Sequence, residues 1–229
     1  MEFEEFVLAA STADLAAEPA AREHADAVEF RLDLADGGLP SLSSYSGELP
    51  LIATNRVAWE GGEAADEQAR IEVLERAVEQ PAVEAVDVEL AAVRAGDCSG
   101  LLEHARDHDV AVIASLHDFD RTPDRETLES LLSTAAEVGD VGKLAVTAET
   151  RADVLALLSA TQTVTARGGR VATVAMGAVG RHSRAVAPLY GSRVGYAPVD
   201  PADATAPGQY DLATLQRLVT ELRGGPAGG

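Results

Sequence analysis

The chain has 229 residues, of which 46% are hydrophobic and 24% are charged. This composition is too apolar for a disordered chain, and the length suffices for one large core or at most two small domains. No apolar run reaches the ~20 residues of a membrane span, and the acidic segment Met1 to Glu5 argues against a secretory or transit signal. The single cysteine, Cys98, cannot form a disulfide within the chain, so we expect a cytoplasmic protein.

The net charge is −20, from 38 Asp and Glu residues against 18 Lys and Arg residues. A protein that binds duplex DNA or an anionic membrane needs the opposite sign, so we expect neither as a partner. Only one basic residue, Lys143, is a lysine. Such acidity with so little lysine resembles proteins of extreme halophiles, in which strong salt screens self-repulsion. An ordinary acidic protein is the alternative; in either case this lysine requires a specific reason.

Short apolar segments rich in β-formers alternate with longer amphipathic ones. The predicted strands are Val7–Ser11, Ala27–Leu34, Leu49–Asn55, Val83–Leu90, Val110–Leu116, Val141–Thr147, Val171–Met176 and Arg193–Ala197. The predicted helices are Ala13–Ala25, Ala64–Gln80, Cys98–His108, Asp124–Val138, Arg151–Ala166, Arg181–Tyr190 and Asp211–Arg223. The Ser, Pro and Gly content of Gly38–Gly47 predicts a loop or one short turn.

Strands that are apolar along most of their length are typical of a parallel sheet covered on both faces. Eight such strands, each followed by a crossover, predict a (β/α)8 TIM barrel of the α/β class. A doubly wound open sheet is the alternative. Because no linker or shift in composition divides the chain, we expect one barrel domain over residues 1–223 and a flexible tail over residues 224–229.

Polar residues stand at the positions where a barrel places its chemistry, namely the C-terminal ends of the strands. They are Glu29, Arg31, Arg56, Glu60, Asp87, Glu89, His117, Lys143, Arg184 and Gln209. Charged groups within apolar strands are costly unless they are paired, so several of them in one closed sheet indicate a shared polar site. Simpler structural interpretations exist for individual residues: Glu29 and Arg31 as an ion pair, and His117 as a hydrogen-bonded core histidine.

Lys143 lies within a small apolar strand, where Ala145 and Val146 could desolvate its amine and favour the neutral form. A neutral amine is the nucleophile that forms an imine with a ketone. One buried lysine beside His117 on the neighbouring strand predicts an imine-forming residue with a proton shuttle. By contrast, His104 and His108 have the spacing of a metal pair, but their charged neighbours indicate a solvated helix face.

A further set of motifs runs along nearly the whole chain. They are Val28–Asp33, Thr54–Arg56 with Glu60–Gly62, Val86–Leu90, Ser115–Phe119 with Thr122 and Pro123, Gly142–Val146, Met176 and Gly177 with Gly180, Ser183 and Arg184, Gly191 and Ser192, and Ala206–Gln209. Together they resemble the type I 3-dehydroquinate dehydratases, or 3-dehydroquinases, of the shikimate pathway. The His-Asp-Phe, lysine-strand and Ala-Pro-Gly-Gln motifs are individually specific.

The resemblance implies a lyase of the carbon-oxygen hydro-lyase class that converts 3-dehydroquinate to 3-dehydroshikimate in aromatic amino acid biosynthesis. It implies that Lys143 forms the imine, that His117 is the general acid and base, and that Glu60 orients the histidine. The substrate-binding residues expected are Glu29, Arg31, Arg56, Arg184, Thr205, Gln209 and Ser11, with Arg184 on the carboxylate. The family uses no metal and no organic cofactor. Its members are commonly dimers, so the resemblance allows a homodimer, although the acidic helices of this chain show no obvious apolar patch.

Two alternatives share part of this pattern. Another imine-forming barrel, such as a class I aldolase, would use Lys143 but would not explain the arginines or the segment Ala206–Gln209. A carboxylate-binding barrel without catalysis would keep its ligand after replacement of Lys143 and His117. Measuring turnover and binding separately in variants of these two residues discriminates between the hypotheses.

Overall fold

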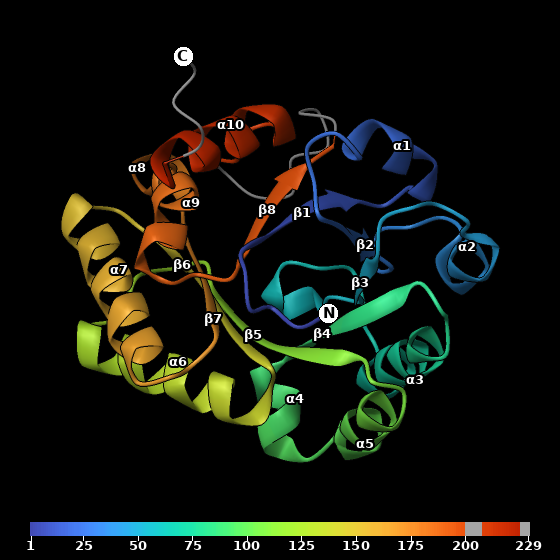
Figure 1. Ribbon diagram of the computed structural model, residues 1–229. Coiled ribbons are helices and arrows are strands. Elements are labelled where there is room, and N and C mark those ends of the chain that lie inside the picture. The colour runs from blue at the N-terminus through green and yellow to red at the C-terminus, as the bar shows by residue number, and fades with distance from the viewer. Residues whose placement is uncertain (200–207, 225–229) are drawn as a thin grey trace.

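The structure, a computed structural model, describes residues 1–199 and 208–224. In this part of the chain eight strands form one parallel sheet in the order β7-β6-β5-β4-β3-β2-β1-β8. They are β1 (Val7–Thr12), β2 (Ala27–Arg31), β3 (Leu51–Thr54), β4 (Val83–Glu89), β5 (Ala111–Asp118), β6 (Val141–Thr147), β7 (Val171–Met176) and β8 (Val194–Pro198). A bridge between Val171 and Ser192 brings the two edges of the sheet together. The nearly closed ring in Figure 1 confirms the predicted TIM barrel and excludes the open sheet.

Helices surround this ring of strands (Figure 1). The longer ones are α3 (Glu67–Val78), α5 (Ser99–Asp107), α6 (Arg125–Val138), α7 (Arg151–Ala166) and α10 (Leu212–Leu222). The shorter pieces are η1 (Leu15–Ala17), α1 (Glu18–Ala21), α2 (Gly38–Ser44), η2 (Ala58–Glu60), α4 (Leu90–Ala95), α8 (Gly177–Gly180), α9 (Ser183–Val186) and η3 (Ala187–Tyr190). The longer helices all fall within predicted segments. Helices α3, α6, α7 and α10 start after an Asp or Thr whose side chain accepts a backbone N–H.

Three helical predictions need correction. Gly38–Gly47 was expected to be a loop or one turn, yet it contains the seven-residue helix α2. Its Leu42 is buried in the core, and this packing outweighs the poor helix propensity of the sequence. Conversely, Ala13–Ala25 and Arg181–Tyr190 hold only short helical pieces. In each, a proline near the start of a new piece lacks the N–H that would continue the preceding helix.

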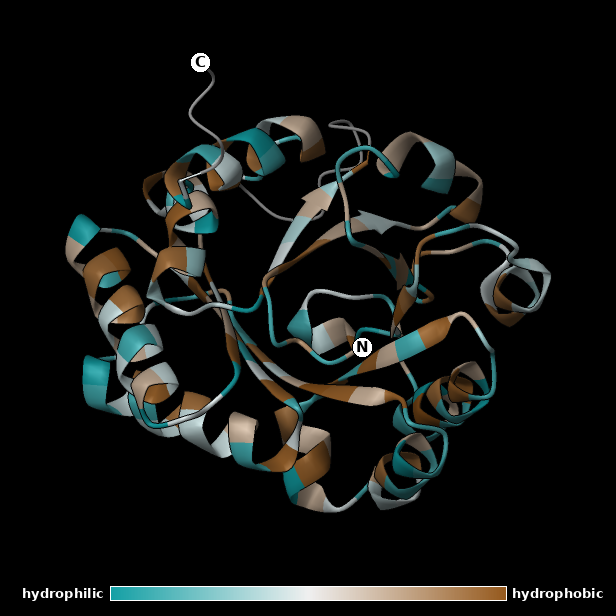
Figure 2. Cartoon of the chain, viewed as in Figure 1, coloured by the Kyte–Doolittle hydropathy of each residue, from teal (hydrophilic) through white to brown (hydrophobic). Residues whose placement is uncertain are grey.

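Alternate residues of each strand face the helices and the barrel interior. On β2, Val28 and Phe30 are fully buried in the apolar cluster between the sheet and the helices. Ala27, Glu29 and Arg31 belong to the interior instead. In Figure 2 the helices are brown mainly where they face the sheet and teal mainly where they face outward. The interior positions form layers two residues apart along the strands, and these layers determine where the site can lie.

An apolar layer fills the end of the interior nearest the strand starts. Phe3, 2% exposed, packs there with side chains from the strands: Ala9, Ala27, Ile52, Ala85, Ala111, Ile113, Val141, Ala172, Val194 and Tyr196. The Met1 ammonium lies 3.2 Å from a carboxylate oxygen of Glu84 and holds the N-terminal segment against this end. The segment around Phe3 therefore closes the barrel floor.

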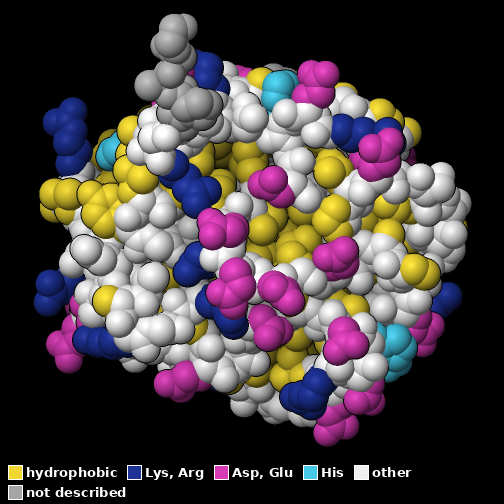
Figure 3. Space-filling view, viewed as in Figure 1, with side chains coloured by type: hydrophobic (Ala, Val, Ile, Leu, Met, Phe, Trp, Pro, Cys, Tyr) yellow, Lys and Arg dark blue, Asp and Glu magenta, His cyan; other side chains and the backbone are white. Residues whose placement is uncertain are grey.

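The outer surface carries much of the acidic excess. On the face seen in Figure 3, Asp and Glu side chains gather around the middle and are interleaved with fewer Lys and Arg side chains. Within the described part of the chain no helix combines the length and apolarity that a membrane crossing demands. Of the predicted tail, residues 225–229 lie outside the described residues, so the domain limits stay a prediction.

Candidate active site

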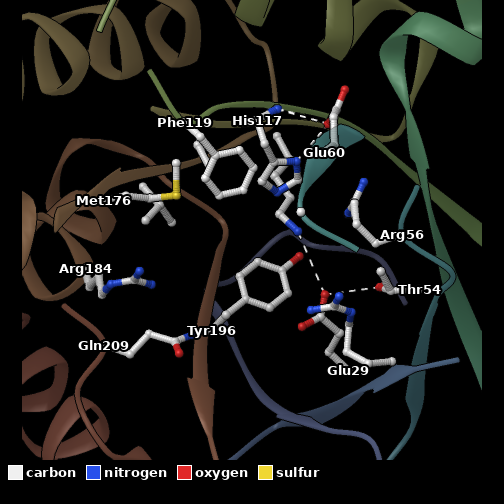
Figure 4. A pocket seen from close by; sticks show the side chains of 15 residues that line it. Glu29, Thr54, Arg56, Glu60, His117, Phe119, Met176, Arg184, Tyr196 and Gln209 are labelled. Carbon is white, nitrogen blue, oxygen red and sulfur yellow. Dashed lines mark hydrogen bonds and ion pairs between the residues drawn. The ribbon is translucent and has the colours of Figure 1, made fainter. Parts of the chain in front are cut away.

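A cavity lies at the carboxyl ends of the strands, where the barrel architecture predicts a site. It is lined by Glu29, Arg31, Thr54, Arg56, Glu60, Gly61, His117, Phe119, Lys143, Ala145, Val174, Met176, Arg184, Tyr196 and Gln209 (Figure 4). Eight of the ten residues predicted for the site are among them. Of the other two, Thr205 lies outside the described residues, and Ser11 lies behind the cavity wall.

Lys143 is the third residue of β6 and is only 6% exposed. Its Nζ donates a hydrogen bond to Oδ2 of Asp87 at 2.8 Å and lies 3.9 Å from a carboxylate oxygen of Glu29. From the sequence we expected its surroundings to be set by the apolar Ala145 and Val146. The curvature of the barrel adds carboxylates from β4 and β2, so ion pairs hold the amine in place within the cavity.

Asp87 also belongs to a buried network around Arg56. The Arg56 guanidinium donates to Asp87 at 2.7 Å, to Glu89 at 2.8 Å and to Ser115 Oγ at 2.7 Å. Burial alone would raise the pKa of Asp87, but Arg56 and Lys143 outweigh it and hold that pKa well below its usual range. Burial lowers the pKa of Arg56, and Asp87 and Glu89 more than reverse this effect. The network is therefore a set of fixed charges.

His117 lies two residues beyond Ser115 on β5 and faces the same cavity. Its Nδ1 is 2.9 Å from Oε2 of Glu60, which also accepts its backbone N–H at 3.1 Å. Burial, reinforced by Arg56 and Lys143, lowers the pKa of His117 well below 6.5, so the ring is neutral. With Nδ1–H directed at Glu60, the lone pair is on Nε2. Burial raises the pKa of Glu60 to about 7 against the opposing effect of Arg56.

A glycine turn positions Glu60. Gly61, which follows it at the end of η2, has a φ of +80°, in the left-handed region that favours glycine. A Cβ at this position would lie 2.6 Å from Cζ of Phe119. The Phe119 ring in turn stacks on His117, with ring centroids 6.2 Å apart. The turn thus places the Glu60 carboxylate against His117, whose ring stacks on Phe119.

Arg184 lies across the cavity from Glu29 and Glu60 (Figure 4). It is 6% exposed, and its Nε and Nη2 have no hydrogen-bond partner among the residues described. Burial lowers its pKa to about 10. Ser183 anchors the short helix by accepting the N–H of Ala175 at 3.0 Å. An unpaired buried cation is costly, and its planar donors suit a carboxylate, so the position is prepared for an anionic ligand.

Glu29 and Arg31 do not form the ion pair that the sequence offered as an alternative. Arg31 instead donates to Asp33 through Nε at 2.9 Å and Nη2 at 2.7 Å. Glu29 accepts from Ser11 Oγ at 2.7 Å and Thr54 Oγ1 at 3.1 Å. Ser11 therefore orients Glu29 from behind.

Sequence reasoning missed two residues at the centre of this arrangement. Asp87 was noted as a charge within a strand but was not assigned to Lys143, because its partner depends on which strands face each other. Tyr196 was not noted; its position two residues after Val194 on β8 was the available signal for an inward side chain. In residues 1–199 and 208–224 no cluster of three His, Cys, Asp or Glu side chains is suited to a metal ion.

Comparison with known proteins identifies the family of the chain. Residues 7–225 match the family described as Type I 3-dehydroquinase. The chain is 57% identical over 226 residues to the 3-dehydroquinate dehydratase of Haloarcula marismortui, covering 97% of this chain and 99% of the relative. It is 50% identical over 226 residues to that of Halobacterium salinarum, covering 97% and 100%. Both relatives come from halophilic archaea, as the charge and the scarcity of lysine suggested.

Solved structures of 3-dehydroquinate dehydratases share the fold of this chain. The crystal structure of 3-dehydroquinate dehydratase from Geobacillus kaustophilus superposes with a TM-score of 0.86 at 28% identity, covering 96% of this chain and 92% of that one. The enzyme from Aquifex aeolicus superposes with a TM-score of 0.80 at 26% identity, covering 94% and 98%. Fold, cavity and sequence lead to one conclusion: the chain belongs to the type I 3-dehydroquinase family of lyases.

Proposed function

We propose that the protein dehydrates 3-dehydroquinate to 3-dehydroshikimate in the shikimate pathway, through an imine on Lys143 and proton transfer by His117. One observation carries this proposal. The chain's only lysine and a neutral histidine line the same buried cavity, and Arg184 lies unpaired across it. An amine, a base and an anion-binding group in one cavity are what an imine mechanism on a keto acid needs.

In the first step His117 takes one proton from the Lys143 ammonium, and the resulting neutral Nζ attacks the ketone carbon of the substrate. This proton and a second one from Nζ convert the ketone oxygen to water, which leaves, and the third Nζ proton remains on the new carbon–nitrogen double bond as an iminium ion. Asp87 supports this step by holding Nζ in the cavity at 2.8 Å. The iminium ion then draws electrons away from the adjacent carbon and makes its C–H bond more acidic.

In the second step Nε2 of His117 takes the proton from that adjacent carbon, and the electron pair moves into the iminium system to form an enamine. The enamine expels the hydroxyl group of the next carbon, which leaves as water after receiving a proton from His117. Hydrolysis of the iminium ion then releases the unsaturated ketone and restores Lys143. Glu60 serves the cycle by fixing Nδ1–H and by stabilising the imidazolium form.

The remaining lining residues position the substrate. Arg184 binds the carboxylate, because its guanidinium has donors without partners in the described structure. Glu29, Arg31 and Gln209 face the same space and suit the hydroxyl groups of the ring. Arg56 already donates to three side chains, so its main contribution is to hold Asp87 and Glu89 in place. The proposed cycle uses no metal or organic cofactor, and a homodimer and a cytoplasmic location remain predictions.

Borohydride reduction in the presence of 3-dehydroquinate, in strong salt, tests this function directly. Reduction traps an imine as a stable amine, and intact-mass analysis followed by a peptide digest locates it. Because Lys143 is the only lysine, the N-terminal amine is the one competing primary amine. We expect a substrate-dependent adduct at Lys143 together with release of the conjugated product. A folded protein without an adduct would instead favour the carboxylate-binding alternative, and full turnover by His117→Ala would refute the role of His117 as the acid and base.

A further inference from the structure

Tyr196 places a hydroxyl group in the cavity that the proposed reaction does not yet use. The residue is the third of β8 and is 7% exposed. Its hydroxyl is buried and makes no hydrogen bond with any residue of the described structure. In Figure 4 the phenol oxygen points toward the middle of the cavity, away from Gln209 and Arg184. A buried hydroxyl without a partner costs about 1–3 kcal/mol, so its retention indicates a partner that arrives with the ligand.

Lys143 lies against the Tyr196 ring. Its Nζ lies 4.1 Å from the centroid of the Tyr196 ring. An atom that becomes bonded to Nζ must therefore lie beside the phenol as well. Burial, together with Glu29 and Asp87, raises the pKa of Tyr196 well above its usual value, so the group is a neutral donor throughout the neutral range.

We propose that the Tyr196 hydroxyl is a further catalytic group, which donates a hydrogen bond to the substrate oxygen on the carbon that Lys143 attacks. This inference rests on the proposed function and adds a donor to it. As Nζ adds to the ketone, the electron pair of the C=O bond moves onto oxygen, and the phenol stabilises the developing charge without losing its own proton. Both protons that convert this oxygen to water come from the Lys143 ammonium, one of them carried by His117. A fixed donor at a developing oxyanion is among the largest contributions to catalysis.

The other polar groups near the ring do not replace this donor. Carboxylates such as Glu29 and Asp87 only accept hydrogen bonds when ionised. The donors of Arg56 are already directed at Asp87, Glu89 and Ser115. The phenol thus supplies a neutral donor next to the lysine without adding a charge to a layer that already contains several.

Replacing the tyrosine by phenylalanine tests the proposal, because Tyr196→Phe removes one oxygen and keeps the ring under Lys143. The matched control is Tyr190→Phe, which removes a phenol oxygen from a partly exposed residue that does not line the cavity. Wild type and both variants are mixed with 3-dehydroquinate in strong salt and quenched with borohydride at increasing times. Intact-mass analysis then gives the fraction of protein that carries the adduct. Turnover is measured in parallel between pH 6 and 9.

We expect Tyr196→Phe to form the Lys143 adduct about 10 to 100 times more slowly than wild type, with a similar fall in kcat and little change in KM. The ratio of the two rates should not vary with pH, since the phenol does not titrate in this range. Thermal stability should be unchanged or raised, because an unpaired hydroxyl is removed. The control should match wild type in every respect.

The outcomes separate the two proposals. If wild type forms the adduct and Tyr196→Phe forms it equally fast, the role of Tyr196 is refuted and the proposed function stands. If Tyr196→Phe loses stability but traps the imine at the wild-type rate, the hydroxyl is structural, which also refutes the role. If wild type itself forms no adduct at Lys143, the proposed function fails and the inference fails with it.

Discussion

The two ends of the barrel interior are built on the same strands from opposite chemistry. On β4, Ala85 lies in the apolar floor and Asp87 in the charged layer above it; on β6, Val141 and Lys143 are related in the same way. Successive inward-facing residues are two positions apart along each strand. This spacing separates a layer stabilised by apolar packing from a layer that must be held together by ion pairs. The floor includes Phe3, so it is completed by a segment outside the sheet.

The comparison shows how the barrel divides stability from chemistry. Apolar floor residues stabilise the fold simply by being buried. The groups of the charged layer lose their hydration on burial. The free-energy cost of this loss is offset only where ion-pair and hydrogen-bond partners exist, as around Arg56. Arg184 and the hydroxyl of Tyr196, whose ring packs with the floor residues, lack such partners in the described structure, and these are the groups we assign to substrate. Substitutions in the floor should therefore change stability, and substitutions in the charged layer should mainly change catalysis.

Replacing Lys143 by alanine should have the largest effect. We expect turnover to fall by at least about 10⁴-fold, because no other group of the site can form the imine. Asp87 keeps Arg56 and Ser115 as partners, so the fold should persist. Product absorbance and borohydride trapping measure the loss. The matched control is Lys143→Arg, which preserves the charge beside Asp87 without a nucleophilic amine. This variant should be equally inactive. Wild-type rates in either variant would contradict the imine mechanism.

Replacing Phe3 by alanine should break the floor. We expect the free energy of unfolding to fall by about 3–5 kcal/mol, the usual cost of deleting a buried aromatic side chain. Both kcat and KM should remain within about twofold of wild type at temperatures where the variant is folded, since the charged layer is carried by the strands themselves. Denaturant unfolding in strong salt and steady-state assays measure the two quantities. A variant with normal stability and impaired kcat would contradict the division between the two layers.

Replacing Arg184 by leucine should reduce kcat/KM by about 100-fold, mainly through KM, because a charged hydrogen-bonding contact to the carboxylate is lost. Without ligand, the variant should be no less stable than wild type, since it removes a buried cation that has no partner in the described structure. The control Arg181→Leu makes the same change of charge at an exposed residue that does not line the cavity. Equal effects of the two substitutions on KM would mean that net charge matters and the specific contact does not.

Among the substitutions in the charged layer, replacing Glu60 by glutamine should have the smallest effect on rate, a fall of about tenfold in kcat as the imidazolium loses its counter-charge. The thermal stability of Glu60→Gln, by contrast, should be higher than that of wild type at high pH. Because the pKa of Glu60 is raised from 4.5 to about 7, ionised Glu60 destabilises the fold above pH 4.5, and this cost is complete above pH 7. At pH 8 the variant should therefore melt a few degrees above wild type.

That difference in melting temperature should shrink as the pH falls from 7 and vanish below about 4.5, where Glu60 is protonated in the folded and unfolded wild type alike. Calorimetry at pH 8, 6 and 4.5 follows it. Glu63→Gln, at an exposed neighbouring position, controls for the loss of one acidic charge and should show no such pH dependence. A wild type more stable than Glu60→Gln at pH 8 would show that the Glu60 carboxylate is a stabilising partner of His117.

Much of the site could be predicted because a parallel barrel collects the ends of its strands at one place. Charges inside the apolar strands marked Glu29, Lys143 and their neighbours, and periodicity with turn residues located the strands to within a few positions. The family motifs assigned roles to Glu60 and Gln209, which lie in connecting segments where periodicity carries no signal. Short helices were predicted less well, since α2 owes its existence to the burial of Leu42.

The order of strands and helices, the acidic surface and the choice of Lys143 as the candidate nucleophile follow from the sequence alone. These features depend on local periodicity, on composition and on the fact that the chain contains a single lysine. Which charges neutralise one another depends on the three-dimensional fold: Lys143 with Asp87, Arg31 with Asp33, and no described residue with Arg184. The physical reason is that electrostatic and hydrogen-bond partners act across space over a few ångströms, and closing the barrel brings together strands that are far apart along the chain.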